Sequence, residues 1–237
     1  MALSEKRRYT PVWLMLSVGT LLSIAAFFSV AKWESKTHRT EFKNQADKLA
    51  TALQQSIDTN LGMLRATGSL YAASENVTRQ EFSIFVKDFL VNYPSILAFN
   101  WSRRVTAQER KVYEQLIGAE GYSNFEIRER GTQGEPLRAG ERPEYFPITY
   151  IEALESQSGA LGYDLLSDPL RRIALQKARD TGKLIATARI KIITSNKLGF
   201  LTFKPIYRKN TNLNSIESRR QNFQGVTTAA FQIYDIV

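Results

Sequence analysis

The stretch LIATARIKIITSNKLGFLTFKPIY, residues 184–207, decides the fold class of this chain. It holds two runs that are rich in β-branched and aromatic residues, Leu184 to Ile193 and Phe200 to Tyr207, separated by a mostly polar turn at 194–199. Two such runs on either side of a short turn predict a β-hairpin. We therefore expect an antiparallel sheet in the C-terminal half of the chain.

Helices are predicted on the N-terminal side of this hairpin. Thr78 and Thr106 each begin a capping box, with a glutamate three residues later. Pro169 follows the capping residue Asp168, a pattern that is typical of the first turn of a helix. The three helices are expected at about 78–92, 106–118 and 169–180.

Strands and loops complete the predicted domain. Strands are expected at 96–101, 125–130, 145–151 and 225–233, and polar loops at 131–142 and 208–222. The strand at 145–151 should lie at a sheet edge or carry a bulge, because Pro147 has no N–H to donate to a neighbouring strand. This order of elements predicts an α+β domain.

Residues 11–31 contain no charged side chain. About 20 apolar helical residues cross the hydrocarbon core of a bilayer, so this segment is predicted to be a transmembrane helix. Trp13 and Trp33 flank it, as indole rings do at membrane interfaces. The basic tail, residues 1–10, is expected in the cytoplasm, and the remainder on the extracytoplasmic (periplasmic or extracellular) side of the cell membrane. The alternative is a cleaved signal peptide, since residues 29–31 resemble a cleavage site.

Residues 32–75 are expected to form one long stalk helix. The segment has no proline, and its apolar side chains recur in steps of three or four residues. These apolar positions are Phe42, Ala46, Leu49, Leu53, Ile57, Leu61 and Leu64. Such a stripe packs either against the domain of its own chain or against the stalk of a second copy. The second arrangement predicts a homodimer through the stalk.

Composition argues against several kinds of site. The chain has no cysteine and a single histidine, His38, so disulfides, cysteine or histidine nucleophiles and histidine-rich zinc sites are not expected. It has no phosphate-binding loop, and acidic pairs such as Glu152 and Glu155 are too common to indicate catalysis. The net charge is +9, but the basic residues are scattered, which favours a solvated basic surface over a nucleic-acid site. No catalytic residue, metal or cofactor is therefore predicted in this segment.

An ordered set of residues resembles the CHASE family, the extracytoplasmic sensor of histidine kinases and nucleotide cyclases. The set comprises Tyr145, Pro147, Tyr150, Gly162-Tyr163-Asp164, the segment 182–187 and the segment 198–207. The string 92–101, followed by Val105, resembles the family's early strand. The family includes plant cytokinin receptors. The resemblance implies a non-catalytic, ligand-binding domain over residues 76–237, with a PAS-like sheet on a long helix.

The resemblance also implies contacts for a small-molecule ligand. In plant members an aspartate binds the ligand by hydrogen bonds, and Asp164 matches it. Ala186 matches a main-chain contact, and Ser195 (or Thr194) matches a hydroxyl contact. Ala186 replaces a larger aliphatic residue, and Arg189 stands where an aromatic or aliphatic residue is usual, so a purine ligand is not implied. If Arg189 points into the pocket, an anionic ligand such as a carboxylate is expected.

The same positions have structural alternatives. Asp164 can bind backbone N–H groups of its own loop. Four aromatic residues can be core side chains or pocket walls: Tyr145, Tyr150, Tyr163 and Phe200. Strand alternation places one set of side chains on a single face, namely Ala186, Ala188, Ile190 and Ile192, and Thr187, Arg189 and Lys191 on the other.

The predicted architecture is an N-terminal transmembrane helix, a long stalk helix and a PAS-like antiparallel sheet domain. The predicted function is the ligand-sensing input domain of a transmembrane signalling receptor. A second membrane span and an output module (a histidine kinase, an adenylate or guanylate cyclase, or a diguanylate cyclase) are expected beyond Val237. The alternative is a membrane-anchored structural or partner-binding protein without a small-molecule ligand.

Overall fold

The computed structural model describes residues 14–24, 26, 47–48, 51, 54–55, 58–59, 61–153, 159–193 and 197–232. The chain divides into two units, Met1–Gln55 and Ser56–Val237. The two ends of the predicted span 11–31, and most of the predicted stalk, lie outside the described residues.

Residues 14–24 of the first unit are helical, and their large apolar side chains are exposed. The hydroxyls of Ser17 and Thr20 donate to the carbonyl oxygens of Leu14 and Leu16, one turn earlier in this helix. Within the part of the chain that the structure describes, no helix has both the length and the apolar character of a membrane span.

A six-stranded sheet forms the centre of the second unit, in the order β6-β1-β10-β9-β7, with β8 also paired to β9. Its strands are β1 (Ile96–Arg103), β6 (Ile148–Ala153), β7 (Ile185–Ala186), β8 (Ile190–Lys191), β9 (Leu198–Tyr207) and β10 (Phe223–Gln232). All of these pairs are antiparallel, which confirms the predicted fold class and the predicted hairpin. β6 lies at the sheet edge, as Pro147 predicted.

Two small sheets lie outside the main one. β2 (Val105–Thr106) pairs with β5 (Glu144–Tyr145), and β3 (Arg128–Arg130) pairs with β4 (Pro136–Arg138). The prediction of a plain loop at 131–142 is therefore wrong, because β4 lies within it. The predicted strand at 145–151 is interrupted between β5 and β6, where Pro147 interrupts regular pairing.

The helices largely follow their sequence signals. The Thr78 box caps α2 (Arg79–Asn92), and Asp168 caps α4 (Pro169–Thr181), which follows the short helix η1 (Leu165–Ser167). The α3 helix (Arg110–Ala119) begins later than predicted: Thr106 and Glu109 form the box hydrogen bonds, but residues 107–109 make a turn. The predicted loop at 208–222 contains α5 (Ile216–Asn222), whose first turn is capped by Ser215.

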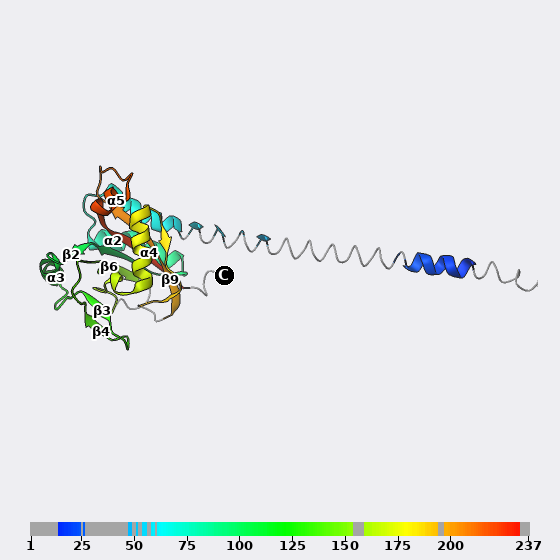
Figure 1. The fold of residues 1–237 in the computed structure, drawn as a ribbon, viewed down its shortest axis with the longest axis horizontal. Helices are drawn as coiled ribbons and strands as arrows, with labels where there is room; N and C mark the ends of the chain where they lie inside the picture. Colours follow the sequence, from blue (N-terminus) through cyan, green and yellow to red (C-terminus); the bar gives the residue numbers. More distant parts are fainter. Residues whose placement is uncertain are drawn as a thin grey trace, which may run out of the picture. The chain divides into compact units, whose positions relative to one another are not determined.

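Both faces of the main sheet are covered, each by a core cluster of apolar side chains (Figure 1). On one face, Leu175 of α4 joins a core cluster with Phe203 of β9. On the other, Phe82 of α2 and Leu64 of helix 61–73 join a cluster with Phe99 of β1. The C-terminal end of the predicted stalk therefore packs on the domain of its own chain. A third cluster lies beneath α3 and comprises Val105, Tyr113, Ile117, Ile127, Ala139 and Tyr145.

The predicted continuous strand at 184–193 is wrong in its middle. The chain pairs with β9 as two short strands, β7 and β8, separated by residues 187–189. Thr187 is buried there and hydrogen-bonds the backbone of Leu201 in both directions, through its own N–H and its hydroxyl. Because residues 187–189 separate the two strands, the alternation of buried and exposed side chains changes between β7 and β8. Ala186 and Ala188 are exposed, whereas Ile190 and Ile192 are buried.

Candidate ligand site

The turn Gly162-Tyr163-Asp164 lies against the chain segment that joins β5 to β6. The N–H of Ile148 donates to the carbonyl of Tyr163 at 3.0 Å, and the N–H of Leu165 donates to the carbonyl of Phe146 at 3.1 Å. Gly162 has a positive φ of 81°, and a Cβ there would lie 2.6 Å from the carbonyl oxygen of Glu126. The backbone at this turn therefore requires glycine, and it delivers Asp164 into the interior.

Asp164 is fully buried, at 0 % exposure, and both of its carboxylate oxygens accept hydrogen bonds from groups of the protein. Its Oδ1 accepts hydrogen bonds from the N–H groups of Phe146 at 2.8 Å and Leu166 at 3.1 Å. Its Oδ2 accepts from Nη1 of Arg142 at 2.8 Å. Burial raises the pKa of Asp164, although these hydrogen bonds and the arginine oppose the rise. The carboxylate is thus costly to bury, and Arg142 offsets part of that cost.

Arg142 connects this buried carboxylate to the surface. Its other terminal nitrogen, Nη2, is paired with Glu129, and about a quarter of its side chain (24 %) is exposed. Its backbone N–H donates to the hydroxyl of Tyr145 at 3.0 Å. One guanidinium therefore bridges the buried Asp164 and the partly exposed Glu129.

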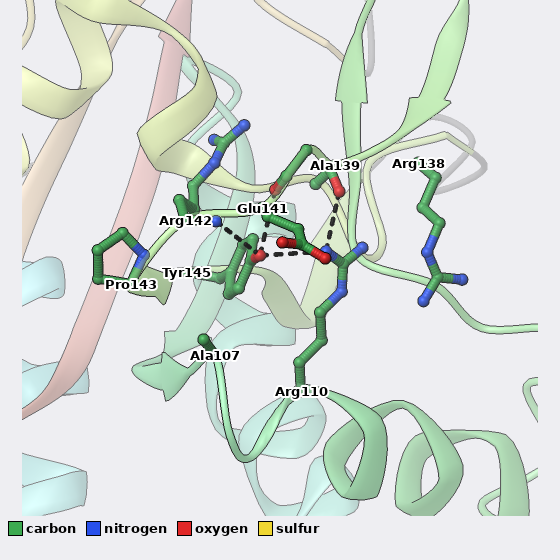
Figure 2. A pocket seen from close by; sticks show the side chains of 9 residues that line it. Ala107, Arg110, Arg138, Ala139, Glu141, Arg142, Pro143 and Tyr145 are labelled. Carbon is green, nitrogen blue, oxygen red and sulfur yellow. Dashed lines mark hydrogen bonds between the residues drawn. The ribbon is translucent and has the colours of Figure 1, made fainter.

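Two clefts meet at Arg142 and Pro143. The first has a volume of about 720 Å³ and lies between α3 and the segment 138–145 (Figure 2). Its lining residues are Ala107, Arg110, Arg138, Ala139, Gly140, Glu141, Arg142, Pro143 and Tyr145. The second has a volume of about 490 Å³ and is lined by Arg104, Thr106, Arg142, Pro143, Glu144, Leu166, Ser167, Arg172 and Gln176. In both linings arginines outnumber acids, so either cleft suits a negatively charged group.

Tyr145 forms a wall of the first cleft, and only its edge reaches the cleft because it is 1 % exposed. Its hydroxyl accepts from Nη1 of Arg110 at 3.1 Å and donates to the carbonyl of Gly140 at 3.1 Å. Figure 2 shows Arg110 rising from α3 toward this hydroxyl, while the Arg138 guanidinium points away from it. Tyr145 therefore orders the cleft rather than presenting a free donor.

The arginines of the first cleft are paired with carboxylates. Arg110 bonds Glu114 at 3.1 Å, and Arg138 bonds the same glutamate at 2.9 Å. A bound anion would have to compete with these acids or share their partners. Because guanidinium groups have five N–H donors, sharing is chemically feasible. Within the described ranges, no group of histidine, aspartate and glutamate side chains is arranged to hold a metal ion.

Of the predicted site residues, the structure links Tyr145 and Asp164, because Arg142 hydrogen-bonds to both, whereas the Tyr163 side chain points elsewhere. The hydroxyl of Tyr163 accepts from Nη1 of Arg171 at 2.9 Å, on the α4 side of the sheet. Tyr150 and Phe200 belong to the cluster on the opposite face.

The remaining predicted residues do not join this group. Ala186 and Arg189 are exposed, and Ser195 lies outside the described residues. Sequence reasoning missed Arg142 and Arg110, whose contacts depend on the β3–β4 hairpin. For Arg142 the one signal was the clustered charge of the segment 138–142, and the sequence carried no such signal for Arg110.

Comparison with known proteins assigns the family. Residues 75–237 match the CHASE domain. The chain belongs to the CHASE domain family. CHASE domains are sensor input domains of signalling receptors, so the resemblance drawn from the sequence is confirmed at this level.

Two curated relatives align with nearly the whole CHASE chain. One is "Hybrid signal transduction histidine kinase A" of Dictyostelium discoideum, 22% identical over 98% of this chain and 11% of that protein. The other is "Histidine kinase 3" of Arabidopsis thaliana, 21% identical over 98% of this chain and 23% of that protein. The chain thus spans less than a quarter of either relative.

Proposed function

We propose that this CHASE chain is the extracytoplasmic, ligand-sensing input domain of a membrane receptor of the histidine kinase type. One observation carries the proposal: both relatives are named histidine kinases, and both align over 98% of the chain rather than over the domain alone. The alignment therefore includes the uncharged segment 11–31 and the stalk 32–75. In this proposal the segment 11–31 anchors the chain in the membrane. The stalk carries the signal and pairs with the stalk of a second copy of the chain.

The proposed topology is tested by reporter fusions. A phosphatase that is active only in an oxidising compartment would be fused after residue 10 or after residue 237. We expect activity from the second fusion alone, because the basic tail should stay in the cytoplasm. Activity from the first fusion and not the second would contradict the proposal.

The ligand in this proposal is a small anion that engages Arg142 where the two clefts meet. Support comes from the surplus of arginine in both linings and from the position of Arg142 between Glu129 and the buried Asp164. An anion that binds Arg142 would weaken its pairing with one of these acids. In this proposal Asp164 acts indirectly, by holding the side chain of Arg142 in place. The family resemblance implies instead that Asp164 contacts the ligand itself, which would require Arg142 to move away from Asp164.

Calorimetric titration with a panel of carboxylates, amino acids and purines tests this site. Arg142→Gln should raise the Kd of an anionic ligand at least tenfold, because a charge-assisted hydrogen bond contributes about 1.5–3 kcal/mol. Arg189→Gln is the matched control, since Arg189 is exposed and lines neither cleft. Loss of binding in Arg189→Gln, with binding kept in Arg142→Gln, would move the site to the β7–β8 edge.

The alternative function is a structural or partner-binding protein. It predicts that no small molecule in the panel binds the folded chain. A ligand at a hundredfold excess over its Kd should raise the free energy of unfolding by about 2.7 kcal/mol, so thermal unfolding separates the two functions.

A further inference from the structure

A row of four side chains crosses the sheet on the face covered by helix 61–73. In register, Tyr150 of β6 lies opposite Trp101 of β1, Trp101 opposite Thr227 of β10, and Thr227 opposite Lys204 of β9. Tyr150 and Trp101 belong to the apolar cluster on this face. The other half of the row is polar, although it lies in the same covered layer.

Helix 61–73 lies directly on this row. The ring of Tyr71 stacks on Trp101 with a centroid distance of 4.3 Å. One turn earlier, a Cβ added to Gly68 would lie 2.9 Å from Cγ of Lys204. The absence of a side chain at Gly68 therefore lets the Lys204 stem pass beneath the helix.

Two hydroxyl groups in this covered layer have no hydrogen-bond partner among the described residues. The hydroxyl oxygens of Thr227 and Tyr71 are buried without a hydrogen bond, and Thr227 has 0 % exposure. A buried hydroxyl without a hydrogen-bond partner destabilises the folded state. Lys204 is half-buried, and burial together with nearby Arg65 lowers its pKa. Within the described ranges of the chain, Lys204 forms no ion pair with a carboxylate.

We propose that a small oxyanion binds between helix 61–73 and strands β9 and β10, held by the ammonium of Lys204 and the hydroxyl of Thr227. Arg65, an exposed residue one turn before Gly68, adds positive charge near the ammonium. The hydroxyl of Tyr71 interacts with Tyr150, at the other end of the row, and is not part of the site. The reason is chemical: the ammonium and the Thr227 hydroxyl both donate hydrogen bonds, and within the part of the chain that the structure describes the hydroxyl has no acceptor and the ammonium has no carboxylate partner. A carboxylate or an inorganic oxyanion supplies both.

This site differs from the clefts around Arg142, with which it shares no residue. Its importance lies in its position, because the anion would touch the helix and the sheet together. Occupancy would therefore change how firmly the C-terminal end of the stalk is held on the domain.

Thermal unfolding of the full chain in detergent micelles tests the site. Sodium sulfate, phosphate or acetate would be titrated against sodium chloride at equal ionic strength. We expect one of these oxyanions to raise the midpoint temperature saturably, by roughly 5 °C at a hundredfold excess over its Kd. Response to acetate alone assigns the site to carboxylates, and response to sulfate or phosphate alone assigns it to inorganic oxyanions. No saturable rise with any of the three would overturn the proposal.

Matched variants separate the site from general salt effects. Lys204→Met and Thr227→Val should both abolish the saturable rise, and Thr227→Val should unfold in chloride no earlier than the wild type, since it removes an unpartnered hydroxyl. Thr202→Val, on the same face but with its hydroxyl bonded to the Ala229 carbonyl, should keep the rise. Arg142→Gln should also keep it, so failure of the proposed ligand site is distinguishable. An undiminished rise in Lys204→Met would overturn the proposal.

Discussion

The buried carboxylate of Asp164 connects the candidate site to the core through hydrogen bonds. Its carboxylate holds the backbone of Phe146 and Leu166 with one oxygen and Arg142 with the other. Each of these partners belongs to a segment that lines or supports a cleft. Changes at Asp164 should therefore affect stability first, and ligand affinity through Arg142.

Asp164→Asn should lower the free energy of unfolding by about 3 kcal/mol, because it removes the buried negative charge that Arg142 and two backbone N–H groups share. The new amide would also place an N–H donor against either Arg142 or the two backbone N–H groups. Urea denaturation measures the loss. The control is Asp88→Asn, because Asp88 is exposed on α2. Equal costs at the two positions would contradict the buried role of Asp164.

Gly162→Ala should destabilise the domain more than Gly159→Ala. Both glycines have positive φ, 81° and 101°, so both substitutions pay for an unfavourable backbone conformation. At Gly162 the new methyl also meets the Glu126 carbonyl oxygen at 2.6 Å, whereas nothing lies within 4 Å at Gly159. Urea midpoints compare the two variants. A difference below the error of the measurement would mean that the turn at Gly162 adapts more freely than its contacts indicate.

At the scale of elements, Asp180 ties the end of α4 to α5. Its carboxylate accepts two hydrogen bonds from Arg220 at 2.9 and 2.6 Å, and one from Arg179 at 2.8 Å. Arg220, with help from Arg179, holds the pKa of Asp180 well below its usual range. A depressed carboxylate pKa contributes stability above the ordinary value of about 3.9, and that stability is lost as the pH falls through the lower pKa of the folded state.

Asp180→Asn should therefore cost about 1 kcal/mol at neutral pH, a modest value because Arg220 is half exposed. The difference from the wild type should shrink as the pH falls below about 4. Urea denaturation at several pH values measures it, with Asp88→Asn on the exposed side of α2 as the control. A difference that grows toward acid would have the opposite sign and would refute this role.

Elements with strong local signals were predictable from sequence. The capping box at Thr78 and the Asp168-Pro169 signal place the starts of α2 and α4 correctly, because capping hydrogen bonds are made within a few residues. The break between β7 and β8 was not predictable, since it depends on a hydrogen bond between Thr187 and distant Leu201. For the same reason Arg142 escaped notice: its partners Glu129 and Asp164 are near only in the folded chain.

At the scale of the whole molecule, the proposed function requires the CHASE domain to couple ligand binding to helix 61–73, which continues from the predicted stalk. Helix 61–73 packs on the sheet through Met63 and Leu64, so a change in the sheet can shift the helix. Binding transmits a signal only if the ligand has different affinities for two arrangements of that helix. The account therefore depends on the rotational register of the predicted stalk, 32–75.

A single-residue insertion near Gln54 tests this claim most directly. It rotates one part of the stalk helix against the other by about 100°, whereas a seven-residue insertion rotates it by about 700°, close to two full turns. The measurement is ligand-dependent autophosphorylation of a chimera that joins residues 1–237 to the second span and kinase of a histidine kinase. We predict that the single insertion leaves the Kd unchanged and abolishes the response, and that the seven-residue insertion restores it. A normal response with the single insertion would contradict the account.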